Sequence, residues 1–240
     1  MCKIKDSKPK TDLLQSGYYA IFGDENIANI CRKVQSTTIR NGNELQGLIF
    51  DQVNYDKKNK SNTFESLVEL IKKGEDFYLS NVKIKNIKGK IEINGKKTID
   101  VDAIVFKDKK LYIIEYKDGD ALDTKKSQSE VESLKKLLDL FSEYVESESK
   151  LVLWRCKDLK NSSIKTSENR EFITTGRDVS KIIDVDFNKI QSIRDGDQVE
   201  NVEYFLNEVL NCITDENINL ISDDTITKLS KIIKNKKEAI

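Results

Sequence analysis

The 240-residue sequence contains no histidine, which excludes several kinds of catalytic site at once. Ser-His-Asp and Cys-His catalysis need an imidazole, as do nucleases that use histidine as the general base. Histidine-dependent zinc and non-haem iron sites are excluded for the same reason. If the protein is an enzyme, its acid–base chemistry must depend on carboxylates, lysine, tyrosine or a metal-activated water.

Cysteine, proline and long apolar runs are also scarce. The 4 cysteines are scattered without a C-x-x-C pair, which favours free thiols in a reducing cytosol over disulfides or a zinc site. The single proline, Pro9, lies in a lysine-rich segment at 1–12 that we expect to be a loose arm. No apolar run approaches the roughly 20 residues that cross a bilayer. We therefore expect a cytoplasmic protein with no membrane partner.

The charge is balanced, with 41 basic and 41 acidic residues. Net charge therefore gives no indication of a nucleic-acid partner, and any such indication must come from local clusters. A chain of this length with 38% hydrophobic residues can bury one substantial core. Since no repeat or low-complexity linker interrupts the sequence, we expect residues 1–240 to form a single domain.

Hydrophobic periodicity predicts the order of helices and strands. The helices are expected at about 25–34, 44–55, 63–73, 124–147, 199–210 and 224–234. The strands are expected at about 77–85, 89–93, 98–106, 111–117, 151–154 and 171–174. This order predicts an α/β fold, in which a mixed central sheet is flanked by helices, followed by a helical part from about residue 177.

The most informative segment is the hairpin predicted over residues 98–117. If 107–110 form the turn, Phe106 pairs with Leu111, and counting back places Asp102 opposite Glu115. Two carboxylates about 5 Å apart repel by about 3 kcal/mol at an effective dielectric near 20. A fold keeps such a pair most readily when a divalent cation lies between them. The hairpin therefore predicts a metal site.

Strand alternation adds two charged side chains to this face. Lys117 lies two residues after Glu115, and Asp100 lies two residues before Asp102. An acid-x-Lys tripeptide is frequent in this sequence, so the tripeptide alone indicates little. Glu115-Tyr-Lys117 differs because it ends an apolar strand, where a charged pair is rarely just a solvated surface. The alternative interpretation is an edge-strand ion pair, with Asp100 paired to Lys117.

Asp102, Glu115 and Lys117 together resemble the catalytic signature of the PD-(D/E)XK nucleases, which include most type II restriction endonucleases. The segment from Lys117 to Lys126 is similar to restriction enzymes in particular, and Val101 stands where the family's proline is usually written. The resemblance implies a restriction-endonuclease-like core at about 36–155 and Mg²⁺-dependent hydrolysis of double-stranded DNA, with Mn²⁺ able to substitute. It also implies a homodimer and a cognate DNA methyltransferase in the cell.

The resemblance assigns roles to individual residues. Asp102 and Glu115 are expected to be metal ligands, with the backbone carbonyl of Tyr116 as a further ligand. Lys117 is expected to orient the attacking water, or to stabilise charge that develops on the phosphate.

A fourth contributor is expected from the helix that begins near residue 44. The segment Arg40-Asn-Gly-Asn-Glu-Leu-Gln46 resembles an R-x-G-x-x-(F/L)-E pattern of several restriction enzymes, with Gln46 at the position of the family glutamate. Alternatively, Glu44 supplies the carboxylate with a shifted helix phase, or it is simply a first-turn acid that the helix dipole favours. Two residues apart on a helix, the two side chains point about 200° apart, so only one can face the hairpin.

Candidate DNA contacts lie around this predicted site. They are Lys125, Lys126, Arg40 and Arg177. Basic side chains near a metal site suit a phosphate backbone, which supplies most sequence-independent affinity. A site-specific restriction endonuclease is the favoured function. The alternatives are a structure-specific repair or junction-resolving nuclease, and a catalytically weak DNA-binding module of the same fold.

Overall fold

The computed structural model describes residues 3–8, 17–54, 56–57, 63–85, 98–119, 124–157, 159, 171–212, 222–225 and 227–228. The chain divides into two compact units. The first comprises Arg40–Arg194, and the second comprises Cys2–Ile39 and Asp195–Ile240. Among the described residues, no helix is both long enough and apolar enough to span a bilayer.

The first unit is built on a mixed six-stranded sheet with the order β1-β2-β3-β4-β5-β6. β2, β3 and β4 are antiparallel, whereas β1 is parallel to β2, and β4, β5 and β6 are parallel to one another. The strands are β1 Asp56–Lys57, β2 Phe77–Lys85, β3 Thr98–Lys107, β4 Lys110–Lys117, β5 Ser147–Leu153 and β6 Ile173–Thr175. The predicted α/β class is confirmed.

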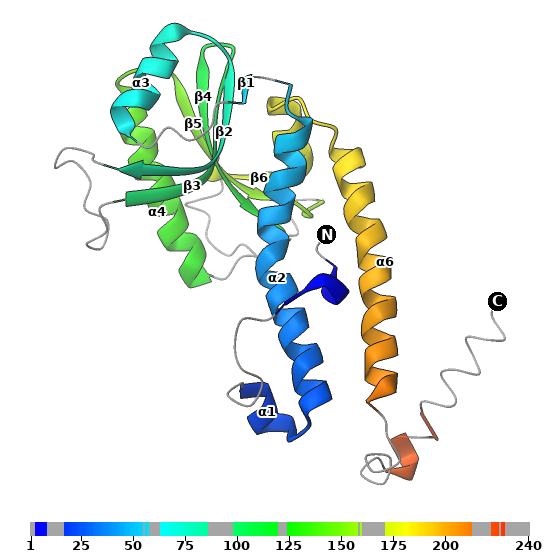
Figure 1. Ribbon diagram of the computed structural model, residues 1–240. Helices are drawn as coiled ribbons and strands as arrows, with labels where there is room; N and C mark the ends of the chain where they lie inside the picture. The colour runs from blue at the N-terminus through cyan, green and yellow to red at the C-terminus, as the bar shows by residue number, and fades with distance from the viewer. Residues whose placement is uncertain are drawn as a thin grey trace. The chain divides into compact units, whose positions relative to one another are not determined.

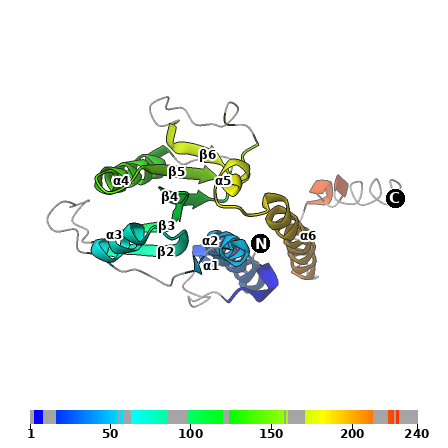
Figure 2. The ribbon, with the colours of Figure 1, turned by 90° about the horizontal axis from the view of Figure 1, so that it is seen from above.

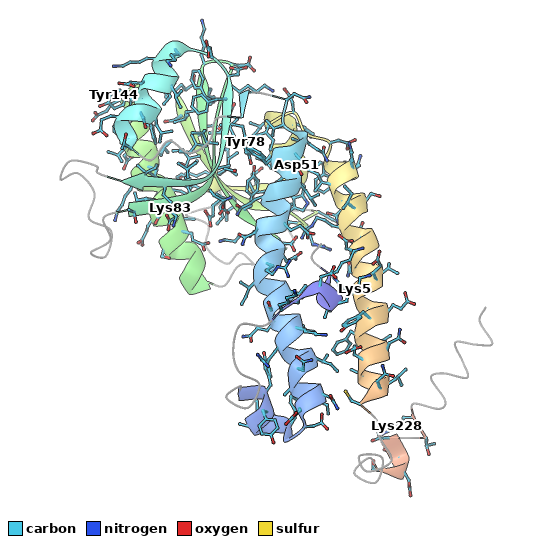
Figure 3. The ribbon with its side chains drawn as sticks, viewed as in Figure 1. Lys5, Asp51, Tyr78, Lys83, Tyr144 and Lys228 are labelled. Carbon is cyan, nitrogen blue, oxygen red and sulfur yellow. The ribbon has the colours of Figure 1, made fainter. Side chains whose placement is uncertain are left out.

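Helices cover both faces of the sheet, as Figures 1 and 2 show. One face packs against α3 (Phe64–Lys73) and α4 (Thr124–Ser142), and the other packs against α5 (Gly176–Ile182) and part of α2. Tyr78, labelled in Figure 3, lies on the second face, with its ring centroid 6.1 Å from that of Phe50 on α2. Burial of both apolar faces stabilises the sheet by roughly 25 cal/mol per Å² removed from water.

The hairpin between β3 and β4 closes through a two-residue turn. Asp108 and Lys109 both have positive φ, 52° and 65°, as a type I′ turn requires. The Asp108 N–H donates to the Asp76 carboxylate at 3.1 Å, which helps to hold this conformation. Phe106 pairs with Leu111, so the predicted register is confirmed.

The alternation of side chains changes phase in the middle of β2 and β3. Ile104 on β3 belongs to the core beneath α3 and α4, but so does Val101, three residues away. On β2 the change coincides with Asn81, whose φ is 51°. Strict alternation, from which Asp100 was expected to share a face with Asp102, therefore does not hold. Asp100 is exposed and pairs across the sheet with Lys83, which Figure 3 labels.

The two helices predicted at 25–34 and 44–55 are one helix, α2 (Glu25–Gln52). The break predicted between these two ranges, which includes Asn41-Gly-Asn43, is wrong. A glycine inside a helix costs about 1 kcal/mol relative to alanine, which is small enough for tertiary contacts to offset. Asn41 makes such contacts, because its side chain hydrogen-bonds to both Asp118 and Arg194.

The observed ends of several other helices and strands differ from the predicted ends. α4 ends at Ser142 rather than near 147, because Ser147 already pairs with Leu111 as the first residue of β5. The strand predicted at 171–174 is shorter, beginning at Ile173, and its end leads into α5 as expected. The helix predicted at 199–210 is the second half of α6 (Phe187–Asn211). The strand predicted at 89–93 lies outside the described residues.

The second unit is helical. It contains a short 3-10 helix at Ile4–Asp6, α1 (Gly17–Phe22), and the parts of α2 and α6 outside the first unit. Within the segment predicted as a loose arm, Ile4 is buried and its N–H donates to the Asn201 side chain at 2.7 Å.

Candidate active site

The centre of the candidate site is a bond between Asp102 and the backbone of β4. The ladder between β3 and β4 runs from Lys107–Lys110 to Ala103–Ile114, so Asp102 and Glu115 are the next residues in register. Instead of continuing the ladder, the Tyr116 N–H donates to Oδ2 of Asp102 at 2.8 Å. Asp102 is thus held against the residue that lies between Glu115 and Lys117.

Lys117 lies between two carboxylates. Its Nζ is 2.9 Å from Oε1 of Glu115 and 2.8 Å from Oε1 of Glu130, which comes from α4. Burial acts to lower the pKa of Lys117, but attraction to these two carboxylates outweighs it and raises the pKa. Lys117 therefore stays protonated and serves as a charge and a hydrogen-bond donor.

Glu130 was not identified from the sequence. It directly precedes Val131, which begins the apolar stripe of α4, and it stands four residues before Leu134 on the same stripe. That spacing places an acid at the sheet-facing side of the helix. This spacing was the sequence signal that could have identified Glu130.

The two carboxylates of the hairpin are energetically unfavourable as a pair. Burial, and then the Asp102 carboxylate, raise the pKa of Glu115 to about 7. Burial also raises the pKa of Asp102, although the bond from the Tyr116 N–H opposes this. A positive charge placed between the two would favour both ionised forms.

α2 brings Gln46 to the Asp102 carboxylate. The buried Gln46 side chain hydrogen-bonds to Asp102, whereas Glu44 Oε2 lies 3.9 Å from Nη1 of Arg194. Gln46 Oε1 is buried and, among the described residues, has no hydrogen-bond partner. A buried carbonyl oxygen without a donor is an unusual and costly feature, which a cation would relieve.

The donor set fits a hard divalent cation. No group of three or more histidine, cysteine, aspartate or glutamate residues is arranged to hold a metal within the described part of the chain. Asp102 and Glu115 instead supply two carboxylates, with the Gln46 amide oxygen beside them. Mg²⁺ is usually held by one or two carboxylates together with neutral oxygens and substrate phosphates.

A second polar cluster, also not identified from the sequence, begins directly after Lys117. The Asp118 carboxylate accepts from Nδ2 of Asn41, from Nη2 of Arg194 and from Nε of Arg155, the last at 3.3 Å. The sequence signal was the four-residue spacing from the buried Ile190 to Arg194, which predicts that the arginine shares the buried face of α6.

The structure describes the side chains of two of the four residues predicted to contact DNA. Arg40 is exposed on α2, and Arg177 is exposed at the start of α5, where its guanidinium lies 4.9 Å from the centroid of the Phe187 ring. Lys125 and Lys126 fall in the first turn of α4, but their side chains lie outside the described residues. Their role in DNA binding stays a prediction.

Comparison with known proteins gives one strong similarity. Over an alignment of 225 positions, the chain is 29% identical to the type II restriction enzyme HhaII of Haemophilus parahaemolyticus, and the alignment covers 88% of this chain and 94% of that enzyme. The chain is related to a restriction enzyme. No protein-family model matches the chain, and no solved structure matches it. The similarity covers most of the length of both proteins.

Proposed function

We propose that this protein is a type II restriction endonuclease of the PD-(D/E)XK kind, which hydrolyses phosphodiester bonds in double-stranded DNA with Mg²⁺. The observation that carries the proposal is the convergence of Asp102, Glu115, Lys117 and Gln46 in a chain similar along most of its length to a restriction enzyme. The absence of histidine supports it, because this set needs no imidazole.

Asp102, Glu115 and Gln46 would hold the cation, with the Tyr116 carbonyl as a further candidate ligand. When bound, Mg²⁺ would supply positive charge for the phosphate in the transition state. Lys117 donates hydrogen bonds and carries its own positive charge, so it would orient the attacking water and stabilise charge on the phosphate oxygens. Glu130 holds the Lys117 ammonium from the α4 side, which limits the positions it can take.

The proposed activity also implies partners. The described part of the chain carries one such site, so cutting both strands of a duplex at one position calls for two copies, and we propose a homodimer on this ground. A nuclease that cuts a specific sequence also endangers the DNA of its own cell. We therefore propose a cognate DNA methyltransferase that modifies the same sequence.

A plasmid digest tests the proposal. Purified protein is incubated with several plasmids of known sequence, with Mg²⁺, with Mn²⁺ or with EDTA. We expect discrete, reproducible fragments with either metal and intact plasmid with EDTA. Preferential cleavage of four-way junctions or flaps would instead favour a structure-specific nuclease, and binding to duplex DNA without any cleavage would favour a DNA-binding module.

A further inference from the structure

The cluster around Asp118 connects the two elements that carry the candidate site. Asp118 directly follows Lys117 at the end of β4, and Asn41 lies on α2, five residues or about 7.5 Å of helix before Gln46. The amide of Asn41 donates to Oδ2 of Asp118. The strand with Glu115 and Lys117 is thereby joined directly to the helix with Gln46.

Arg194 contacts both residues of this connection. Its Nη2 contacts both the Asp118 carboxylate and, at 3.3 Å, the side-chain oxygen of Asn41. The Arg194 side chain is 0% exposed, so solvent does not compensate its charge. Its Nε and Nη1 have no hydrogen-bond partner among the described residues, although Nη1 lies 3.9 Å from Glu44.

Burying an arginine with unsatisfied donors is costly, and apolar replacements of buried ion pairs are often as stable or more so. Stability alone therefore explains this arrangement poorly. The same contacts would instead set the spacing between Gln46 and the hairpin carboxylates, which must match a cation closely if all are to bind it.

We propose that Arg194, Asn41 and Asp118 form a positioning clamp for the metal site. The clamp holds α2 against the end of β4, so that Gln46, Asp102 and Glu115 can bind one cation together. The inference deepens the proposed function and rests on it, since it assigns these three residues to the same site. None of the three is expected to touch the cation.

An exchange of side chains tests the clamp. Asp118→Asn removes the carboxylate that faces Arg194, and Asn41→Asp places two carboxylates against each other. The double variant Asn41→Asp/Asp118→Asn keeps one amide and one carboxylate, both beside Arg194. Each single variant should therefore weaken Mn²⁺ binding, measured by titration calorimetry, by about tenfold or more, the usual scale of groups that orient metal ligands. The double variant should recover most of the loss.

The matched control is Asp184→Asn. Asp184 forms an ion pair with Lys107 at the turn end of the same hairpin, so this variant makes the same chemical change away from the site. It should leave Mn²⁺ affinity unchanged. Thermal melting with EDTA establishes that each variant is folded. If a single variant does not fold, Asn41→Ala, which removes only the amide, replaces it in the same measurement.

The outcomes separate the clamp from the proposed function. Folded single variants with wild-type Mn²⁺ affinity would overturn the clamp, and so would a double variant no better than Asp118→Asn. Wild-type protein that binds Mn²⁺ but cuts no DNA would instead overturn the proposed function, while the clamp would still be judged on affinity. In a cleaving enzyme, the single variants should need about tenfold more Mg²⁺ for half-maximal rate, and the double variant should recover.

Discussion

Charged side chains at the two ends of the β3–β4 hairpin have opposite environments. At the turn end, Lys110 forms ion pairs of 2.8 Å with Glu146 and 2.6 Å with Glu148. Hydrogen bonds to these carboxylates raise the pKa of Lys110, and the bond from Lys110 lowers the pKa of Glu148. At the other end, burial and Asp102 raise the pKa of Glu115 to about 7.

This difference indicates that the charged side chains stabilise the fold at the turn end of the hairpin but not at the other end. Opposite charges at the turn satisfy one another in solvent, where each pair contributes up to about 1 kcal/mol. At the other end, the half-buried carboxylates of Glu115 and Glu130 share Lys117, and the buried amide oxygen of Gln46 has no described partner. Unfavourable polar arrangements that persist in a fold are typical of functional sites.

The largest effect should come from removing a proposed metal ligand. Asp102→Ala or Glu115→Ala should lower the cleavage rate by a thousandfold or more, that is, at least about 4 kcal/mol of transition-state stabilisation. DNA binding, measured by mobility shift, should survive because it depends on distributed phosphate contacts. Glu148→Gln at the turn end is the matched control and should cut normally. Near wild-type cleavage by either alanine variant would contradict the proposed site.

Lys117→Ala should lose about a hundredfold in rate, the usual scale for a group that orients a nucleophile or stabilises developing charge. Lys110→Ala makes the same change at the turn end and should leave the rate unchanged. Single-turnover cleavage at saturating Mg²⁺ distinguishes this loss from weaker metal binding. Equal rates for wild type and Lys117→Ala would exclude Lys117 from the reaction.

Substitutions of Gln46 test whether α2 supplies a metal ligand to the site. Gln46→Ala should cut about ten- to a hundredfold more slowly, because it removes a neutral ligand. Gln46→Glu should stay active at lower Mg²⁺ concentration, because it adds a charged ligand. Glu44→Gln, a neutral replacement that keeps the size of the side chain, should have a smaller effect, since the Glu44 carboxylate lies 3.9 Å from Nη1 of Arg194. An inactive Glu44→Gln beside a normal Gln46→Ala would reverse this assignment.

Much of this site could be predicted from the sequence because its residues are close together in the chain. Counting residue pairs back from the predicted turn was enough to place Asp102 beside the Glu115–Lys117 segment. The phase change at Asn81 could not be predicted, because a positive φ at asparagine depends on tertiary context. For that reason Asp100 was placed on the wrong face.

The residues that were missed come from distant segments. Glu130 and Arg194 reach the hairpin from α4 and α6, and no local period relates either of them to Lys117. The same reason explains the break that was predicted between residues 34 and 44. Local propensity favoured two helices. The contacts that Asn41 makes with Asp118 and Arg194, which are distant in the sequence, favour one helix.

The last effect is on stability, and it should have opposite signs at the two ends of the hairpin. Because the pKa of Glu115 is raised to about 7 in the fold from a usual 4.5, the folded state binds more protons over that interval. The free energy of unfolding of metal-free protein should therefore fall as pH rises through this window, by up to about 3 kcal/mol.

Glu115→Gln should remove this dependence, and at pH 8 in EDTA it should be more stable than wild type by about 1–3 kcal/mol. Glu148→Gln should instead be less stable than wild type by under about 1 kcal/mol, because it loses a partner of Lys110 near the surface. Urea denaturation at pH 5 and pH 8 measures both. Adding Mg²⁺ at pH 8 should restore wild-type stability but leave Glu115→Gln nearly unchanged, because the cation would compensate only an ionised pair. If both variants shift stability in the same direction, the contrast between the two ends of the hairpin does not hold.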